Sequence, residues 1–222
     1  MRNLFVNYYI AKDESRQKEI DICLQKNLES NLFDRVCIIV DRSTRLPAIF
    51  QSYQTKSIVQ IITIDPIQPM FFDLFHLISN YSNDKDINVL SNADIIFDNT
   101  IDLCNNIRSE NCYALSRWEL NSDLSKNEEQ VQVNNDSQDT WIFKGRVKNI
   151  NTMYCDFPMG KMGCDNRIAF EINKAGYNIL NPCKSVKTWH LHTSQFRGYT
   201  TQERNGDTVV PAPYLKIPLT FI

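Results

Sequence analysis

Strand-like and helix-like patterns of apolar residues alternate along the first hundred residues. Continuous apolar runs predict four buried strands, at residues 4–10, 36–40, 59–64 and 87–90. Helical spacing of apolar side chains predicts three helices between them, at residues 15–28, 46–54 and 70–81. Because the strand segments do not alternate between apolar and polar residues, we expect parallel pairing with both sheet faces covered. This order predicts a Rossmann-like half of the form β-α-β-α-β-α-β.

The second half of the chain is less regular. We expect helices at residues 100–107 and 165–175, and strands at residues 112–118, 140–143 and 177–180. Residues 119–138 are rich in Asn, Ser, Asp and Glu, which predicts a mobile surface loop. No internal repeat or low-complexity block occurs, so a single α/β domain is predicted over residues 1–222. The proline-bearing residues 201–222 suggest a tail that leads to further domains of the same polypeptide.

Composition and charge narrow the classes of partner. Hydrophobic residues make up 42% and charged residues 23% of the 222 positions, as in ordinary soluble globular proteins. The formal net charge is −2 and the chain has no basic block, so binding to nucleic acid has no electrostatic support. No run approaches 18 apolar residues, so we expect no membrane span. An anionic ligand would have to be met by local side chains or by a metal.

The cysteines and the first residues indicate a cellular compartment. The seven cysteines are an odd, scattered set without a C-x-x-C pair, which favours reduced, buried thiols over a disulfide or zinc framework. The first seven residues lack the apolar core and the cleavage site of a signal peptide. We therefore expect a cytoplasmic protein.

Acidic and amide side chains follow the ends of several predicted strands. Asn92 and Asp94 come just after the strand at 87–90, and Asp41 and Asp65 end the two strands before it. In an open α/β sheet, ligands bind at the carboxyl ends of the strands, and a carboxylate there suits a hard divalent cation carrying phosphate oxygens. Two alternatives stay open: Asn92 and Asp94 could form a turn that caps the next helix, and Asp41 could cap a turn rather than contact a base or ribose.

Two later features carry further candidate chemistry. Asp165 begins a predicted helix, where it could serve as an N-cap worth roughly 1 kcal/mol, or as a general base for a sugar hydroxyl. Asp139 is a second candidate acid, and Arg117 could also reach the site. His190 and His192 are two residues apart on an extended segment and project to the same side. With a carboxylate such a pair would favour manganese over magnesium.

Taken in order along the chain, these stretches resemble the GT-A glycosyltransferases. Asn92-Ala93-Asp94 stands where that family has its acidic D-x-D motif. The segment 163–169, followed by the segment 174–177, resembles the late helix that carries the base in inverting members. His190 or His192 resembles the histidine that completes the metal shell in that family.

The resemblance implies a fold, a reaction and a set of ligands. Residues 1–100 would form the nucleotide-sugar-binding half and residues 101–200 the acceptor and catalytic half. Mn²⁺ or Mg²⁺ would be held by Asp94 with His190 and His192. The partners would be a nucleoside diphosphate sugar, with a UDP-sugar favoured, and a glycan hydroxyl.

Individual roles follow from the same resemblance. Donor binding is expected from five residues: Asn7, Asp41, Asp65, Asn92 and Asp94. Since Asn92 replaces the first acid of the motif, we expect it to bond the ribose and to leave metal binding to Asp94. Asp165 would be the base of an inverting transfer, with Asp139 as the second candidate catalytic acid.

Other functions remain open at this point. A metal-dependent phosphoesterase could use the two histidines, although it would need more clustered carboxylates. A non-catalytic glycan- or nucleotide-binding module would bind a sugar nucleotide without consuming it. A retaining enzyme could use similar acids. Residues 43–47 resemble the phosphate loop of sugar-nucleotide pyrophosphorylases, but the flanking glycines are missing and the segment follows the second strand, so we reject that interpretation.

Overall fold

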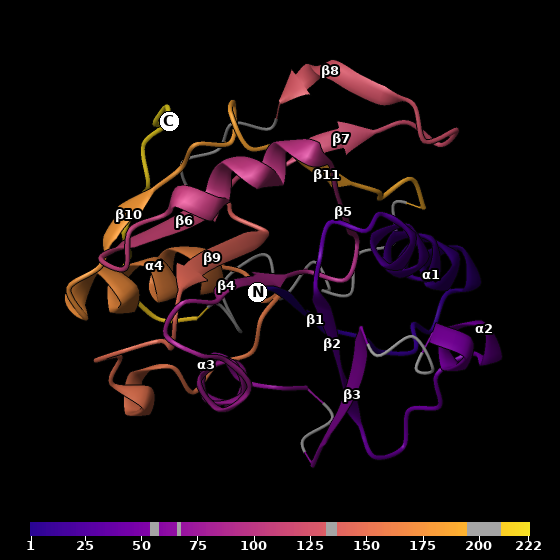
Figure 1. Ribbon diagram of the computed structural model, residues 1–222, viewed down its shortest axis with the longest axis horizontal. Helices are drawn as coiled ribbons and strands as arrows, with labels where there is room; N and C mark the ends of the chain where they lie inside the picture. The colour runs from indigo at the N-terminus through magenta and orange to yellow at the C-terminus, as the bar shows by residue number, and fades with distance from the viewer. Residues whose placement is uncertain (54–57, 66–67, 132–136, 195–209) are drawn as a thin grey trace.

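A seven-stranded, mostly parallel sheet forms the centre of the molecule (Figure 1). The computed structural model describes residues 1–53, 58–65, 68–131, 137–194 and 210–222. In spatial order the strands are β10 (Asn178–Leu180), β6 (Asn111–Leu115), β9 (Thr140–Lys144), β4 (Ile87–Ser91), β1 (Arg2–Asn7), β2 (Arg35–Asp41) and β3 (Val59–Ile64). Strand β9 runs antiparallel to both of its neighbours, and the other adjacent pairs are parallel. The predicted mixed α/β fold is confirmed.

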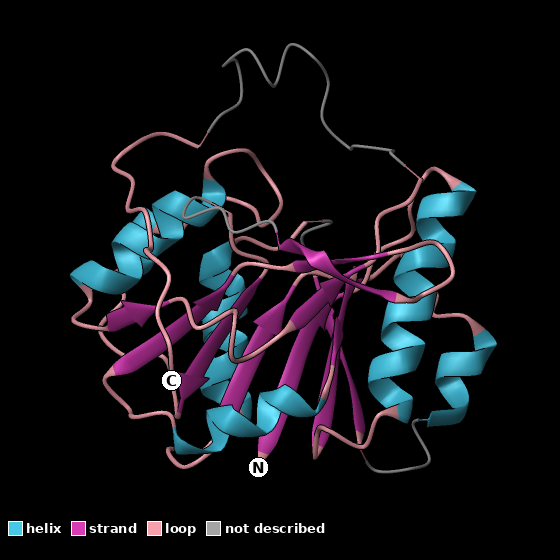
Figure 2. Cartoon of the chain, turned by 90° about the horizontal axis from the view of Figure 1, so that it is seen from above, coloured by secondary structure: helices cyan, strands magenta, loops and turns pink. Residues whose placement is uncertain are grey.

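Helices cover both faces of this sheet (Figure 2). One face packs against α1 (Glu14–Glu29), α2 (Ala48–Gln51) and the 3₁₀-helix η2 (Asn99–Asn106), and the other packs against α3 (Phe71–Tyr81) and α4 (Cys164–Lys174). A second 3₁₀-helix, η3, spans Thr152–Tyr154. The two faces bury separate apolar clusters, so the strands are apolar on both sides, as their continuous runs predicted. The order β1-α1-β2-α2-β3-α3-β4 matches the prediction for the first hundred residues.

Local sequence signals explain where the two helices that carry site residues begin. Helix α1 begins after Asp13, whose side chain accepts a 2.9 Å hydrogen bond from the backbone N–H of Arg16. Helix α4 begins after Gly163, which has φ +80°, a conformation that glycine adopts without steric cost. It ends before Gly176, with φ +95°, in the left-handed conformation expected of a helix end.

A second, four-stranded sheet lies beside the large one, near α1 (Figure 1). Its order is β5 (Ile95–Phe97), β11 (Thr188–His190), β7 (Trp118–Leu120) and β8 (Lys126–Val131). Its apolar side forms a small core in which Trp118, Trp189 and Leu191 pack with Cys23 of α1. This small sheet matters for function because β5 and β11 bring the 94 and 190 regions together.

Two details of the predicted secondary structure are wrong. The predicted surface loop 119–138 contains β8 and part of β7, which pair antiparallel as a hairpin. Its residues 132–136 lie outside the described part of the chain. The predicted strand 112–118 is divided between β6 and β7, which belong to different sheets. The predicted helix at 100–107 is present, as the 3₁₀-helix η2.

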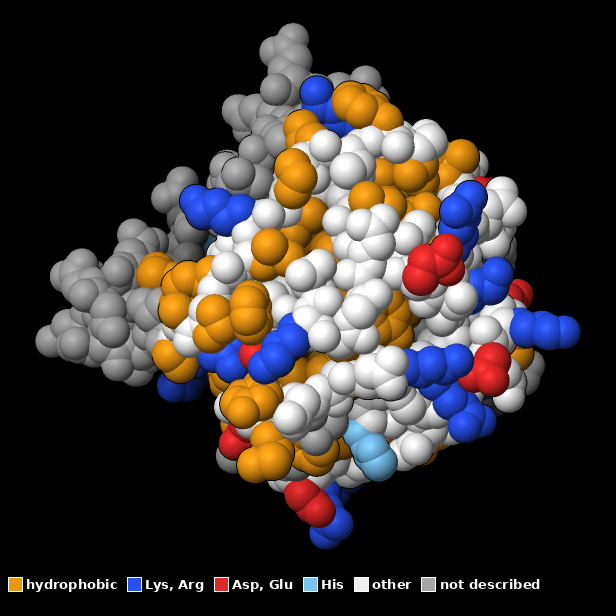
Figure 3. Space-filling view, turned by 90° about the vertical axis from the view of Figure 1, so that its left-hand side faces the viewer, with side chains coloured by type: hydrophobic (Ala, Val, Ile, Leu, Met, Phe, Trp, Pro, Cys, Tyr) orange, Lys and Arg blue, Asp and Glu red, His pale blue; other side chains and the backbone are white. Residues whose placement is uncertain are grey.

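The surface and the cysteines agree with the composition. On the face shown in Figure 3, Lys and Arg side chains are scattered among acidic and apolar ones and form no continuous basic surface over the part described. Within the described ranges, no helix combines the length and apolar character needed to cross a membrane. All seven cysteines are buried and free.

Candidate metal and acid–base site

The turn between β4 and β5 carries Asn92 and Asp94 at the carboxyl end of a central strand. The following strand pairs antiparallel with β11, and this register sets Ile95 opposite His190. The backbone N–H of Leu191 donates a 2.9 Å hydrogen bond to the carbonyl of Asp94. Sheet pairing therefore fixes the distance between the Asp94 carboxylate and the histidine segment, which lie almost a hundred residues apart in sequence.

Asp94, His190 and His192 form a compact cluster of potential metal ligands. One ligand atom from each lies within 4.8 Å of the others. Two ligands on opposite sides of one ion are separated by roughly 4.2 Å, so small side-chain movements would bring all three into binding distance. Asp94 Oδ1 and His192 Nε2 are buried and have no hydrogen-bond partner among the described residues. Because buried polar atoms normally have partners, these two atoms fit a metal site.

Two cationic groups already contact Asp94. Arg16, from the first turn of α1, donates to Oδ2, and His190 Nε2 lies 3.1 Å from the same oxygen. Burial raises the pKa of Asp94, but the charges and hydrogen bonds of His190 and Arg16 outweigh burial and hold it well below its usual range. Burial lowers the pKa of His190, yet the neighbouring carboxylates raise it to about 9. A metal at Nε2 would therefore replace a proton.

Arg16 also connects this cluster to the segment after His192. Its Nη1 donates to Glu19 Oε2 at 2.9 Å, one turn further along α1. Glu19 Oε1 accepts hydrogen bonds from the backbone N–H groups of Thr193 and Ser194, at 2.6 and 2.7 Å. The beginning of α1 and the residues that follow the histidine pair are thus held together by one buried ion pair.

On the opposite side of His190, a second chain of contacts runs toward Asp139. His190 Nδ1 lies 2.8 Å from Glu119 Oε2. Arg117 binds Glu119 through Nε at 3.1 Å and Asp139 through Nη1 at 2.8 Å. Burial raises the pKa of Glu119, but its bonds to His190 and Arg117 lower it below the ordinary value. The carboxylate of Glu119 is therefore ionised at neutral pH.

Asn92 supports Asp139 rather than the metal-ligand cluster. Its side-chain amide donates a 2.6 Å hydrogen bond to Asp139 Oδ1, and its backbone N–H donates to the Asp139 carbonyl at 3.0 Å. The amide nitrogen of Asn92 thus already donates to Asp139, and its expected contact with the ribose stays a prediction.

Asp165 lies near Asp139 and differs from it in environment. It is in the first turn of α4 and does not cap the helix, since Gly163 occupies the N-cap position. Its carboxylate accepts hydrogen bonds from the Cys164 thiol at 3.3 Å and from the backbone N–H of Gln138. Burial and then the negative charge of Asp139 raise the pKa of Asp165 from 3.8 to about 7. A carboxyl group with this pKa can exchange a proton near neutral pH.

The remaining predicted donor-site residues lie outside this cluster. Asn7 ends β1, beside the end of β4. Asp41 accepts hydrogen bonds from the hydroxyl and backbone N–H groups of Ser43 and Thr44, which lower its pKa to about 2. These contacts favour the turn-cap alternative for Asp41, and its contact with a base or ribose stays a prediction. Asp65 follows the outer strand β3, roughly 14 Å from β4 at ordinary strand spacing, and its exposed carboxylate pairs with Arg42.

Three residues of the site were not predicted from the sequence: Arg16, Glu19 and Glu119. Arg16 and Glu19 have the spacing of an ordinary surface ion pair on a helix, so the sequence gives no sign that they meet Asp94. Glu119 was assigned to the predicted loop. The only available signal was the alternation Arg117-Trp118-Glu119, which on a strand places the two charged side chains on one side.

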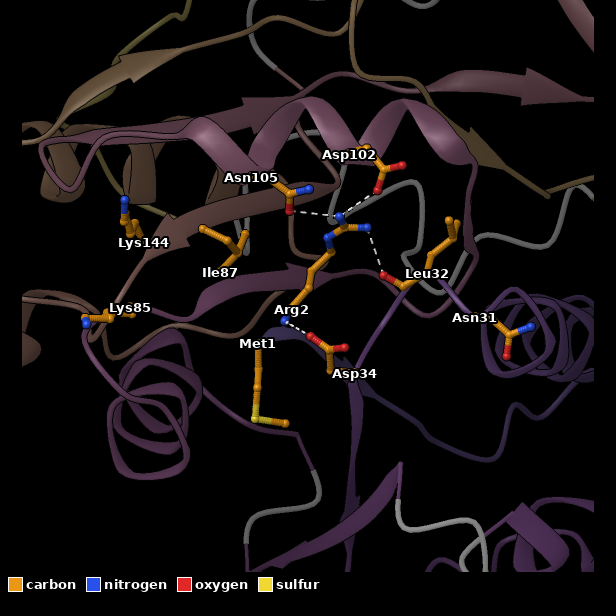
Figure 4. A pocket seen from close by; sticks show the side chains of 10 residues that line it. All are labelled: Met1, Arg2, Asn31, Leu32, Asp34, Lys85, Ile87, Asp102, Asn105 and Lys144. Carbon is orange, nitrogen blue, oxygen red and sulfur yellow. Dashed lines mark hydrogen bonds and ion pairs between the residues drawn. The ribbon is translucent and has the colours of Figure 1, made fainter.

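A hollow of about 510 Å³ lies at the amino ends of the central strands β1 and β4, opposite the carboxyl ends that carry the Asp94 cluster (Figure 4). Arg2 is one of the residues that line it, and its guanidinium donates to Asp102 at 2.6 Å, to Asn105 at 2.8 Å and to the carbonyl of Leu32 at 2.9 Å. The predicted catalytic and metal-binding residues do not line this hollow. It is separate from the cluster around Asp94.

Comparisons with known proteins identify the fold. No protein-family model matches the chain, and no curated protein matches its sequence significantly. Solved structures match over most of its length, and the similarity is of the GT-A, Rossmann-like kind. Both glycosyltransferases and nucleotidyltransferases are among these structures.

Three of these structures show the range of the similarity. The mannosyltransferase PcManGT from Pyrobaculum calidifontis, in complex with GDP-Man and Mn²⁺, has a TM-score of 0.56 and 13% identity, over 89% of this chain and 58% of that one. GalNAc-T7 with UDP, GalNAc and Mn²⁺ has a TM-score of 0.55 and 7% identity, over 92% and 47%. The inositol-1-phosphate CTP transferase from T. maritima has a TM-score of 0.52 and 9% identity, over 94% and 97%. This chain spans about half the length of the first two proteins.

Proposed function

We propose that this protein transfers a sugar from a nucleoside diphosphate sugar, with a UDP-sugar as the favoured donor, to a hydroxyl group of a glycan, and that it requires Mn²⁺ or Mg²⁺. The observation that carries the proposal is the convergence of Asp94, His190 and His192, with Asp94 Oδ1 and His192 Nε2 buried and without a partner among the described residues. Two proteins of similar fold were solved with Mn²⁺ and a nucleotide or nucleotide sugar, which supports the same ligand class here.

The chain's own residues would share the work of binding the donor. Asp94, His190 and His192 would hold the metal at the carboxyl edge of the sheet. When bound, a divalent cation supplies Lewis-acid stabilisation of the charge that builds up on a leaving diphosphate. Arg16 keeps Asp94 ionised, and the buried setting strengthens each of these electrostatic contacts.

Asp165 is the residue that we assign to the acceptor. Its carboxylate would take the proton of the acceptor hydroxyl while the hydroxyl oxygen forms a bond to the anomeric carbon of the sugar. The bond from that carbon to the diphosphate oxygen breaks, and the diphosphate leaves with the electron pair. Attack from the face opposite the leaving group inverts the anomeric configuration. Burial and the negative charge of Asp139 raise the pKa of Asp165 to about 7, so its carboxylate can accept a proton near neutral pH.

Nucleotidyl transfer is the second candidate, because the inositol-1-phosphate CTP transferase matches this chain over 97% of its own length. The two reactions break different bonds in the donor. Sugar transfer releases a nucleoside diphosphate, whereas nucleotidyl transfer from a nucleoside triphosphate releases pyrophosphate. Two features favour sugar transfer to a hydroxyl: the histidine pair beside Asp94, and the pKa of about 7 of Asp165, which suits a general base.

A binding panel followed by product analysis tests the proposal. Thermal-shift measurements with UDP-, GDP- and dTDP-sugars should show stabilisation that needs Mn²⁺, worth about 2.7 kcal/mol at a ligand concentration one hundred times Kd. Incubation of the stabilising donor with a set of acceptor glycans should then give a nucleoside diphosphate and a glycan heavier by one sugar, measured by mass spectrometry.

Other products would point to other functions. Release of pyrophosphate from a nucleoside triphosphate would indicate nucleotidyl transfer, and cleavage of simple phosphate esters would indicate a phosphoesterase. Mn²⁺-dependent binding without consumption of any donor would indicate a non-catalytic binding module. Asp94→Ala should abolish the metal-dependent thermal shift, while the matched change Asp156→Ala, at an exposed position, should leave it intact.

A further inference from the structure

His190 has a carboxylate on each side of its ring. Its Nε2 faces Asp94 Oδ2 at 3.1 Å, and its Nδ1 lies 2.8 Å from Glu119 Oε2. The contact with Glu119 follows from sheet pairing, because His190 and Glu119 are partners in the register between the parallel strands β11 and β7. A backbone register therefore determines which acid meets Nδ1.

The two contacts of His190 decide which ring nitrogen would exchange its proton for a metal. An ionised carboxylate can only accept a hydrogen bond, so Nδ1 carries the proton that is shared with Glu119. Nε2 is then the ring nitrogen that faces Asp94 and the point where the ligand atoms converge. Histidine ligands of metals generally donate their other N–H to a carboxylate or carbonyl, which fixes the tautomer and the ring orientation.

We propose that Glu119 is a positioning residue that holds the His190 ring with Nε2 presented to a divalent metal. This inference rests on the proposed function, since it takes the metal site of Asp94, His190 and His192 as given. Arg117 holds Glu119 from the other side and also binds Asp139. Arg117 thus connects Glu119, which orients His190, with Asp139, which lies near Asp165.

Three substitutions separate the hydrogen bond from the charge of Glu119. Glu119→Gln keeps the side-chain length and an accepting oxygen but removes the charge. Glu119→Asp keeps the charge but is one methylene too short to reach Nδ1. Glu119→Ala removes both the charge and the hydrogen bond. The probe is MnCl₂ alone, titrated into the full chain, with free Mn²⁺ measured by electron paramagnetic resonance and Kd checked by calorimetry.

The proposal predicts that the hydrogen bond decides the affinity for Mn²⁺. Glu119→Gln should bind within about threefold of the wild-type Kd, whereas Glu119→Asp and Glu119→Ala should bind roughly 10- to 100-fold more weakly. Glu110→Ala, the same change at an exposed glutamate, should bind as the wild type does. Thermal midpoints of all variants, recorded without metal, show which variants remain folded.

The outcomes distinguish this inference from the proposed function. Equal Kd values for all Glu119 variants, with lower thermal midpoints alone, would overturn the positioning role and leave the metal site standing. Tight binding by Glu119→Asp with weak binding by Glu119→Gln would also overturn it, because charge alone would then explain the effect. If the wild type binds no Mn²⁺, or if Asp94→Ala binds as tightly as the wild type, the metal site itself is wrong.

Discussion

Asp94 and Asp165 belong to one network of charged side chains, yet their pKa values move in opposite directions. Asp94 touches two cationic groups, Arg16 and His190, which overcome the effect of burial and keep the carboxylate ionised. Asp165 accepts hydrogen bonds from a thiol and a backbone N–H and lies near the negative charge of Asp139, so burial raises its pKa to about 7.

The opposite pKa shifts of these two aspartates suit them to different roles in one reaction. Carboxyl groups whose surroundings push their pKa values apart are suited to different tasks in one reaction. A permanently ionised carboxylate suits the binding of a cation, whereas a carboxyl group that titrates near neutral pH suits the transfer of a proton. A series of contacts leads from Asp94 through His190, Glu119 and Arg117 to Asp139, which lies near Asp165. The two aspartates therefore lie in the same region of the molecule.

The largest effect is expected from removing the ionised member of the pair. Asp94→Ala should abolish binding of Mn²⁺ and all sugar transfer. It should also reduce the free energy of unfolding by about 3–5 kcal/mol, because Arg16 and His190 would be left as buried charges without this counter-ion. Urea denaturation and Mn²⁺ titration measure the two effects. The exposed control Asp156→Ala should change stability by no more than about 0.5 kcal/mol.

The next largest effect is expected from Asp165, the aspartate assigned to proton transfer. Asp165→Asn should keep the affinities for Mn²⁺ and for the donor but lose turnover by roughly 100- to 10,000-fold, because an amide cannot take the acceptor proton. Steady-state kinetics and donor titration on the same protein sample check this split. Unchanged turnover in Asp165→Asn would remove Asp165 as the base.

The pH dependence of Asp165 gives a third, smaller effect. In the wild type, turnover should fall about tenfold for each pH unit below about 7, as the carboxyl group becomes protonated. Because its pKa is raised on folding, the folded state binds the extra proton between about pH 4 and 7, so its contribution to stability is present at low pH and is lost as pH rises through about 7. Asp165→Asn should therefore gain stability relative to the wild type between pH 5 and pH 8. A constant difference across this range, measured by urea denaturation, would show that the pKa of Asp165 is not raised.

The smallest effect tests the role of Asn92. Asn92→Asp creates an Asp-Ala-Asp sequence at positions 92–94, but it removes the amide that donates to Asp139 and sets two carboxylates against each other. We expect a loss of stability of about 1–3 kcal/mol at pH 8, less at pH 5.5, and no gain in affinity for Mn²⁺. The control is Asn80→Asp at an exposed position. Tighter Mn²⁺ binding by Asn92→Asp would instead place residue 92 among the metal ligands.

The architecture could be predicted from the sequence because it depends on local patterns. Continuous apolar runs and helical spacing predicted the parallel strands and the helices on both faces. The small sheet was largely missed. Residues 119–138 are mostly polar, and β7 pairs with β11, a partner that sequence patterns do not reveal.

The candidate site also contains residues that local sequence could identify and contacts that only the folded chain reveals. Asp94 could be selected because it follows the end of a predicted strand, and His190 and His192 because they lie two residues apart on an extended segment. The structure brings the three together. Asp41 looked equally suitable, but its neighbours Ser43 and Thr44 bind its carboxylate. Glu119 gained its contact with His190 through the register of two strands, which the sequence does not encode locally.

The proposed function requires that a divalent metal binds among Asp94, His190 and His192. Anomalous diffraction from crystals of this protein soaked in MnCl₂ tests it most directly. We expect one manganese peak within ligand distance of an Asp94 carboxylate oxygen and the Nε2 atoms of both histidines. A peak elsewhere, or no peak at this cluster at a Mn²⁺ concentration that saturates binding in solution, would contradict it.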